Sequence, residues 1–292
     1  MNGQLDILGN IEDKAAAEQI VNVASVPQRS PFRYPGGKTW LIPVFRRWMR
    51  QFDPEKTTFI EPFAGGGIVS LTVAFEKLAK QVILVELDNE IAAVWETMLN
   101  DDNDWLTQQI VDFEMNYVNL QRHFGSEKKS LREIAFTTIL KNRVFHGGII
   151  TKGSGLIKNV ENGKGLTSRW YPKTLAARIS AIKSVRHKIK FISGDAFQSI
   201  KKYAGDGDAV FFVDPPYTVA GKRLYTYFDI DHESLFETMN QTRGHFLMTY
   251  DDTEEVRTWT QKFNFHYKTI PMKTTHHLEK YELLISNKII KL

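Results

Sequence analysis

The sequence contains no cysteine, which excludes a disulfide scaffold, catalysis by a thiol and a cysteine-ligated zinc site. It also has no apolar run near the about 18 residues that a membrane-spanning helix needs, so no membrane partner is expected. Its first residues combine neither a basic stretch nor an apolar core, and we therefore expect no secretory signal. A chain of 292 residues is then expected to form about two domains of a soluble, cytoplasmic protein.

The formal charge of +4 hides an uneven distribution along the chain. Residues 121–190 hold sixteen Lys or Arg and three acids, a net charge of +13, so the rest of the chain carries −9. Solvated surfaces normally mix both signs, and a one-signed block of this length favours a polyanionic partner. Nucleic acid is the commonest such partner. Heparin-like polymers and acidic proteins remain alternatives.

Hydrophobic patterning divides the chain into an α/β part and an interruption. Strands and helices alternate up to about residue 98, which is typical of a doubly wound α/β domain with a parallel sheet. The expected strands are 57–60, 82–85, 190–195, 209–214, 245–250 and 281–286. The expected helices are 39–49, 68–78, 90–98, 104–120, 130–141 and 174–185.

The domain organisation follows from where the alternation stops and resumes. Residues 101–185 contain three helical stretches and a glycine- and lysine-rich loop or hairpin at 147–165. We therefore predict an N-terminal leader (1–29), an α/β domain formed by 30–100 and 186–292, and an insertion between its second and third strands. The insertion, 101–185, carries most of the basic block.

A glycine turn, Phe63-x-Gly65-x-Gly67, stands between the first expected strand and its helix. Glycines at such a place let the backbone approach a ligand at the N-terminus of the helix. Glu86 ends the next strand, where an acid can bind the two ribose hydroxyls of an adenosine-bearing cofactor. Asp88 competes for the same role. The alternative is a tight structural turn followed by a plain surface acid.

The most specific signal is Asp214-Pro215-Pro216-Tyr217, directly after the apolar run AVFFV. A carboxylate at the carboxyl end of a central strand lies where open α/β sheets bind ligands. Two prolines hold the backbone rigid and remove two N–H donors, so the loop offers a carboxylate and a carbonyl as paired acceptors. Such a pair suits an exocyclic amine on a planar base that stacks on Tyr217. A proline turn that merely ends a strand is the alternative.

Together with the Tyr34-Pro35-Gly36-Gly37-Lys38 loop, the glycine turn and the DPPY loop resemble, in this order, the Dam-like N6-adenine DNA methyltransferases. The resemblance covers roughly residues 30–287. It implies a Rossmann-like, S-adenosylmethionine-dependent methyltransferase domain with an inserted, mainly helical DNA-recognition domain. No metal ion is implied.

The resemblance also implies roles for single positions. Tyr34 and Lys38 match cofactor-contacting positions, although the family more often has Trp where Tyr34 stands. Glu86 matches the ribose-binding acid, usually Asp in Dam-like members; Asp214 matches the catalytic acid and Tyr217 the ring that holds the flipped base. The cofactor-binding candidates are Tyr34, Lys38, Phe63, Gly65, Gly67, Glu86, Asp195 and Asp214; the catalytic candidates are Asp214, Pro215, Pro216 and Tyr217. The DNA-binding candidates are Asn142, Arg143, Arg169 and Lys173.

The implied reaction is direct transfer of a methyl group to the N6 amine of adenine in double-stranded DNA. The target base must leave the duplex, which costs a few kcal/mol, and the basic insertion would offset this cost through phosphate contacts. A separate restriction nuclease is a conceivable companion, and a monomer or weak dimer is expected. Alternative readings are an N4-cytosine or RNA-base methyltransferase, a non-catalytic nucleic-acid-binding protein and, third, a nicotinamide dehydrogenase.

Overall fold

A computed structural model describes residues 25–33, 37–127, 130–150, 154–157, 165–217, 229–273 and 279–290. The described strands form one seven-stranded sheet with the order β3-β2-β1-β4-β5-β7-β6. The strands are β1 (Thr58–Glu61), β2 (Gln81–Glu86), β3 (Ile189–Ser193), β4 (Ala209–Val213), β5 (His245–Asp251), β6 (His266–Lys273) and β7 (Glu279–Ser286). The neighbours from β3 to β5 are parallel, and β7 is antiparallel to both β5 and β6. The expected α/β sheet is confirmed, but it is mixed rather than wholly parallel, because β7 runs antiparallel to its neighbours.

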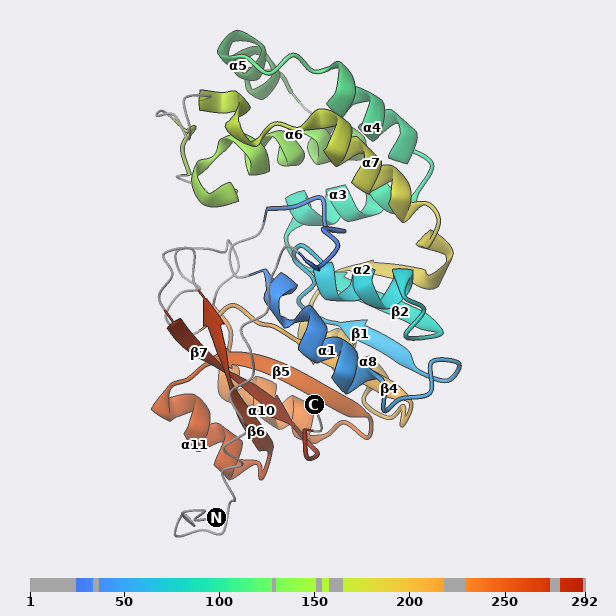
Figure 1. The fold of residues 1–292 in the computed structure, drawn as a ribbon, viewed down its shortest axis with the longest axis vertical. Helices are drawn as coiled ribbons and strands as arrows, with labels where there is room; N and C mark the ends of the chain where they lie inside the picture. Colours follow the sequence, from blue (N-terminus) through green and yellow to red (C-terminus); the bar gives the residue numbers. More distant parts are fainter. Residues whose placement is uncertain are drawn as a thin grey trace.

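Helices cover both faces of this sheet, and the central strands are therefore apolar without alternation. Phe59 and Phe212 pack into the core on the side of α1, α2 and α3, which lie in front of the sheet or above it in Figure 1. Their chain neighbours Ile60 and Phe211 pack into a second core with residues of α8, α10 and α11. These helices are α1 (Ile42–Met49), α2 (Ile68–Phe75), α3 (Asn89–Leu99), α8 (Ala196–Tyr203), α10 (His232–Asn240) and α11 (Glu254–Lys262).

A helical segment stands between α3 and β3 and forms the upper part of the molecule in Figure 1. Its helices are α4 (Asn103–Asp112), α5 (Tyr117–Gly125), α6 (Leu131–Val144) and α7 (Pro172–Ile182). Leu106, Ile139 and Ile179 extend the first core into this segment. Short 3-10 turns are η2 (Lys38–Leu41), η3 (His146–Gly148), η5 (Gly165–Arg169) and η6 (Arg186–Lys188). Within the described ranges, no helix is both long and apolar enough to cross a membrane.

The single helix expected over 104–120 is wrong in one respect, because the structure divides it into α4 and α5. Asn116 ends the intervening loop in an extended conformation, and its side-chain oxygen accepts the Asn119 N–H as the N-cap of α5. The glycine- and lysine-rich stretch begins with a hairpin-like contact, since Phe145 and Leu156 form an antiparallel bridge. Much of that stretch lies outside the described residues.

Strand β6 was not expected from the sequence. Its residues, HYKTIPMK, combine lysines with Pro271, which lacks a ladder N–H. β6 occupies the edge of the sheet, the position where a strand tolerates both proline and charge. The edge therefore explains why the hydrophobic pattern is too weak to identify this strand.

Candidate active site

The carboxyl ends of β1 and β4 form the centre of the candidate site. These strands are parallel neighbours, with Thr58, Phe59 and Ile60 in register with Ala209, Val210 and Phe211. The chain leaves them in opposite directions across the sheet, first to β2 and then to β5. Such a switch point opens a crevice at the carboxyl edge of the sheet. The glycine turn after β1 and the DPPY loop after β4 therefore lie beside each other.

The glycine turn is held by side chains from the next strand and helix. The Gly65 N–H donates to Glu86 Oε2 at 2.9 Å, and Trp95 Nε1 donates to the Gly65 carbonyl at 2.9 Å. Gly67 has φ +58°, the left-handed conformation, and is the N-cap of α2. A Cβ on Gly67 would lie 2.4 Å from the Trp95 ring. Phe63, half-buried at the start of the turn, packs against the second core.

The two acids at and just after the end of β2, Glu86 and Asp88, were both candidates to bind a ribose, and they have different hydrogen-bond partners in the structure. Asp88 is the N-cap of α3, and its Oδ1 accepts the backbone N–H groups of Glu90 and Ile91. Glu86 holds the turn through Gly65 and also accepts the Asp88 N–H at 2.9 Å. Burial raises the pKa of Glu86 to about 7, against the lowering effect of these N–H groups. Both acids thus accept two backbone N–H groups, and which of them would bind a ribose stays a prediction.

Asp195 stands after β3, as the sequence suggested, and serves as the N-cap of α8. Its Oδ1 accepts the Gln198 N–H at 2.9 Å. The side chain is half-exposed, so it keeps an oxygen for a further polar contact at the same edge of the sheet. Its role toward a cofactor stays a prediction.

A third acid, Glu61, was missed by sequence reasoning. It is the last residue of β1, is only 4% exposed and accepts the Ser70 N–H at 2.9 Å, so it caps α2, whose N-cap glycine has no side chain. Burial raises its pKa to about 8, and the charges of Asp214 and Glu86 act in the same direction. Its signal was the charge that ends a buried strand. Three carboxyl groups thus crowd one crevice.

Glu61 should make the ligand-free protein less stable as the pH rises. The native state keeps its proton up to about pH 8, whereas an ordinary Glu loses it near 4.5. Between these values the native state binds more protons than the unfolded chain, so the free energy of unfolding falls from about pH 5 to about pH 8. Melting curves across this range should show the decline. Glu61→Gln should reduce it, most clearly between about pH 7 and pH 8, because Glu86, with its pKa raised to about 7, adds to the decline below that. The surface variant Glu55→Gln should leave the decline unchanged. An equal dependence of stability on pH in all three proteins would contradict the raised pKa of Glu61.

The DPPY loop places its acid against a buried lysine. Asp214 Oδ1 accepts Lys38 Nζ at 2.9 Å and the Thr249 hydroxyl at 2.7 Å. Lys38 is 4% exposed and lies 3.6 Å from Glu282 Oε2. Burial lowers the pKa of Lys38, but the attraction of Asp214 and Glu282 outweighs it and the net direction is upward. The pairing leaves Asp214 Oδ2 without a hydrogen-bond partner among the described residues.

Tyr217 completes this cluster. Its hydroxyl donates to Glu282 Oε2 at 3.0 Å, and its ring stacks on that of Tyr250 at 6.0 Å between centroids. Burial raises the pKa of Tyr217 well above its ordinary value, with the charge of Asp214 acting in the same direction. Pro215 and Pro216 are buried beside it. Tyr34, the other aromatic candidate, lies outside the described residues.

Three of the four DNA-contact candidates make hydrogen bonds within the protein, and their contact with DNA stays a prediction. Asn142 is 1% exposed; it accepts the Arg33 N–H at 2.9 Å and donates to the carbonyls of Arg33 and Gly148. Arg143 is also buried and donates to the Pro31 carbonyl. Their helix α6 therefore anchors the segment just before Lys38. The sequence could not indicate this role, because a polar residue on a helix does not reveal which loop covers it.

The other two candidates differ in exposure. Arg169 is 9% exposed, and its Nη1 donates to the Phe145 carbonyl at 3.4 Å. Lys173 is exposed on the first turn of α7. Lys173 thus remains the candidate whose side chain reaches solvent directly.

Replacing Asn142 with alanine distinguishes the two roles. The substitution removes three buried hydrogen bonds and should lower the free energy of unfolding by about 2–3 kcal/mol. Urea denaturation measures this loss, and Lys173→Ala, on the surface, should change it by less than about 0.5 kcal/mol. Unchanged stability combined with a selective loss of DNA affinity in Asn142→Ala would restore the direct DNA contact.

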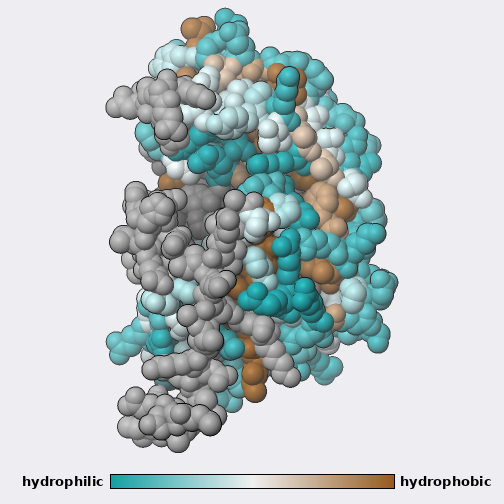
Figure 2. Space-filling view, in the orientation of Figure 1, coloured by the Kyte–Doolittle hydropathy of each residue, from teal (hydrophilic) through white to brown (hydrophobic). Residues whose placement is uncertain are grey.

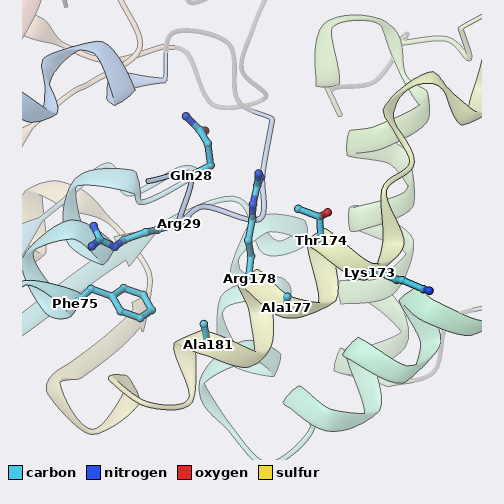
Figure 3. Close-up of a pocket in the computed structure, with 8 residues that line it drawn as sticks. All are labelled: Gln28, Arg29, Phe75, Lys173, Thr174, Ala177, Arg178 and Ala181. Atoms are coloured by element: carbon cyan, nitrogen blue, oxygen red, sulfur yellow. The ribbon is translucent and has the colours of Figure 1, made fainter. Parts of the chain in front are cut away.

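A groove of about 570 Å³ lies where α7 meets the end of α2, away from the acidic residues described above. Figure 3 shows Thr174, Ala177, Arg178 and Ala181 along α7, opposite Phe75. On the face seen in Figure 2, apolar residues lie among hydrophilic ones. Arg29 crosses the Phe75 ring and pairs with Glu76 at 2.8 Å. None of the candidate catalytic residues lines this groove.

Comparison with protein-family models gives one match. The model described as D12 class N6 adenine-specific DNA methyltransferase covers residues 34–273 of the chain. This range includes the glycine turn, the helical segment and the DPPY loop. No curated protein sequence matches the chain.

Solved structures give more distant similarities. The rRNA methyltransferase AviRa from Streptomyces viridochromogenes aligns over 92% of this chain and 94% of its own, with 13% identity and a TM-score of 0.41. The N-terminal domain of human METTL16, in complex with SAH, aligns over 98% and 89%, with 8% identity and a TM-score of 0.42. TrmK from M. capricolum, with S-adenosyl-homocysteine, aligns over 82% and 65%, with 7% identity and a TM-score of 0.36. Scores of this size do not by themselves relate the molecules in function.

Proposed function

The chain belongs to the D12 class of N6 adenine-specific DNA methyltransferases, and from this premise we propose that it methylates adenine within a defined sequence of double-stranded DNA after flipping the base out of the duplex. The observation that carries the proposal is the set of hydrogen-bond partners of the Asp214 carboxylate. One of its oxygens is held by Lys38 and Thr249, and the other accepts no hydrogen bond from the residues that the structure describes. That is the arrangement a hydrogen-bond acceptor for a substrate amine requires.

The site fits the methyl donor of this enzyme class, S-adenosylmethionine. When bound, it supplies an electrophilic methyl group on a positively charged sulfonium. The crevice concentrates Glu61, Glu86 and Asp214; burial, together with the charge of neighbouring carboxylates, raises the pKa of Glu61 to about 8 and that of Glu86 to about 7. A cationic ligand lowers the cost of ionising these carboxyl groups. Glu86 would hold the ribose, Gly65 and Gly67 would admit the cofactor close to the backbone, and Asp195 would lie near the adenine.

Asp214 and the Pro215 carbonyl would act on the substrate amine. The lone pair of an exocyclic amine is delocalised into the ring, and this makes the amine a poor nucleophile. Asp214 Oδ2 and the Pro215 oxygen would accept its two N–H groups, which localises the lone pair on nitrogen. Pro216 keeps the backbone rigid, and Tyr217 would offer its ring to the flipped base. The contribution of these residues is positioning and electrostatic preorganisation.

The helical segment is proposed as the DNA-recognition domain, with boundaries at residues 101 and 185. It contains most of the basic block of +13, and that charge supports contacts with phosphates. Lys173 is exposed and is kept as a phosphate contact. Asn142 and Arg143 are proposed to act indirectly, because they fix the segment that leads to Lys38. The enzyme would then work in the cytoplasm, on DNA.

The test is to incubate the protein with S-adenosylmethionine and unmethylated plasmid DNA, and then to analyse the nucleosides by mass spectrometry. N6-methyladenine is the expected product, and sequencing for modified bases would reveal the recognition site. A product that contains N4-methylcytosine but no N6-methyladenine would overturn the adenine assignment. DNA binding without transfer of a labelled methyl group would favour a non-catalytic DNA-binding protein.

A further inference from the structure

Glu282 is a buried acid that neither the glycine turn nor the DPPY motif identifies. It lies in β7, in register with Asp251 of β5 on one side and Ile270 of β6 on the other. It is 6% exposed, and burial raises its pKa, while the charge of Lys38 opposes this. A carboxyl group buried in a sheet is costly unless it has partners. Both described partners of Glu282 belong to the candidate active site.

The contacts of Glu282 converge on one oxygen. Oε2 accepts the Tyr217 hydroxyl at 3.0 Å and lies 3.6 Å from Lys38 Nζ. The same Lys38 ammonium binds Asp214 at 2.9 Å and lies 4.9 Å from the centre of the Tyr217 ring. The four side chains therefore form a closed cluster that joins η2, the DPPY loop and β7.

This cluster restricts the two groups that would touch the substrate. The prolines fix the backbone before Tyr217, but the ring can still turn about its side-chain bonds. The bond from its hydroxyl to Glu282 and the stacking on Tyr250 remove that freedom. Lys38, placed between two carboxylates, holds Asp214 by its Oδ1 atom and thereby restricts the rotation of that carboxylate. Displacements near 1 Å can cost about 100-fold in rate.

We propose that Glu282 is a positioning residue: through one carboxylate oxygen it holds the Tyr217 hydroxyl and the Lys38 ammonium, and so orients the ring and the acid that receive the target adenine. The inference rests on the proposed function. It adds Glu282, from the antiparallel part of the sheet, to the residues that orient the substrate. Glu282 itself does not touch the substrate. Its loss should therefore lower kcat and leave the KM for S-adenosylmethionine within about threefold.

The experiment is a double-mutant cycle in which the rate of plasmid methylation is measured for each variant. The kinetics give kcat and the KM values for S-adenosylmethionine and for DNA. Glu282→Ala removes both contacts, and Tyr217→Phe removes the hydroxyl but keeps the ring. Each is expected to lower kcat about 10- to 100-fold. Combined in one protein, they should cost no more than about threefold beyond the worse single variant, because they break the same link.

Glu282→Gln keeps the size of the side chain and an oxygen for Tyr217 but removes the charge facing Lys38, so it covers the case in which Glu282→Ala fails to fold. It should also lower kcat about 10-fold with an unchanged melting temperature. Tyr281→Phe is the matched control, because this exposed neighbour on β7 should lose its hydroxyl without effect. Glu282→Gln within twofold of wild type would refute the inference, as would additive losses in the double variant. Wild-type protein that yields no N6-methyladenine would instead refute the proposed function, and the inference with it.

Discussion

Alanine at position 214 should abolish methyl transfer, with kcat reduced at least about 1,000-fold while DNA binding stays largely intact. Asp214 supplies the only carboxylate oxygen proposed to face the substrate amine, and the shortened side chain leaves nothing in its place. Single-turnover transfer of labelled methyl groups measures the loss, and a filter-binding or anisotropy assay measures DNA affinity.

The protein should still fold after this substitution, because the Lys38 ammonium retains a second carboxylate partner. With Asp214 gone, the buried ammonium still lies 3.6 Å from Glu282, so it does not become an isolated buried charge. Asp214→Asn is the matched variant: it preserves shape and the Thr249 contact but loses one acceptor site, and should also be severely impaired. Activity of Asp214→Ala within tenfold of wild type would overturn the assignment of Asp214.

Alanine at position 67 should destabilise the whole protein by about 2–5 kcal/mol, through left-handed strain and overpacking together. Gly67 has φ +58°, and its new Cβ would lie 2.4 Å from the ring of Trp95. Trp95 cannot move aside freely, because it is fully buried and its Nε1 holds the Gly65 carbonyl. The variant should therefore have a lower melting temperature and bind S-adenosylmethionine more weakly.

Gly125→Ala provides the control for this experiment. A Cβ at that position at the end of α5 meets nothing within 4 Å, so the substitution should leave stability unchanged or raise it by about 0.4–1 kcal/mol. Thermal melts with and without S-adenosylmethionine separate the effect on folding from the effect on the cofactor site. A Gly67→Ala melting temperature equal to that of wild type would show that the turn is not constrained by Trp95.

Much of the fold could be predicted because its signals are local. The apolar run before Asp214 identified β4, and the glycine turn placed the helix that became α2. Strand β6 could not be predicted in this way, since an edge strand lacks the hydrophobic pattern of a buried one. The division into α4 and α5 depended on Asn116, a residue that caps a helix only in the right backbone conformation.

The candidate site was predictable where a motif carries the chemistry and unpredictable where packing selects a partner. Asp214 and Lys38 were both named from sequence, yet nothing local indicated that they form an ion pair. Asn142 had the residue type of a DNA contact, but burial against Arg33 and Gly148 gives it a structural role. Glu86 was named from sequence as the ribose-binding candidate with Asp88 as its competitor, and only the structure shows that Asp88 caps α3.

The sequence by itself indicated the α/β class of the fold, most of its strands, the basic interruption and the residues proposed to perform the chemistry. It did so because hydrophobic period, turn residues and charge runs act over a few neighbouring positions. The tertiary structure alone decided that Lys38 and Glu282, near opposite ends of the chain, lie 3.6 Å apart and contact Asp214 and Tyr217 of the DPPY loop. A buried charge takes the partner that the packed chain brings within a few ångströms, and that choice is made only when the sheet has closed around it.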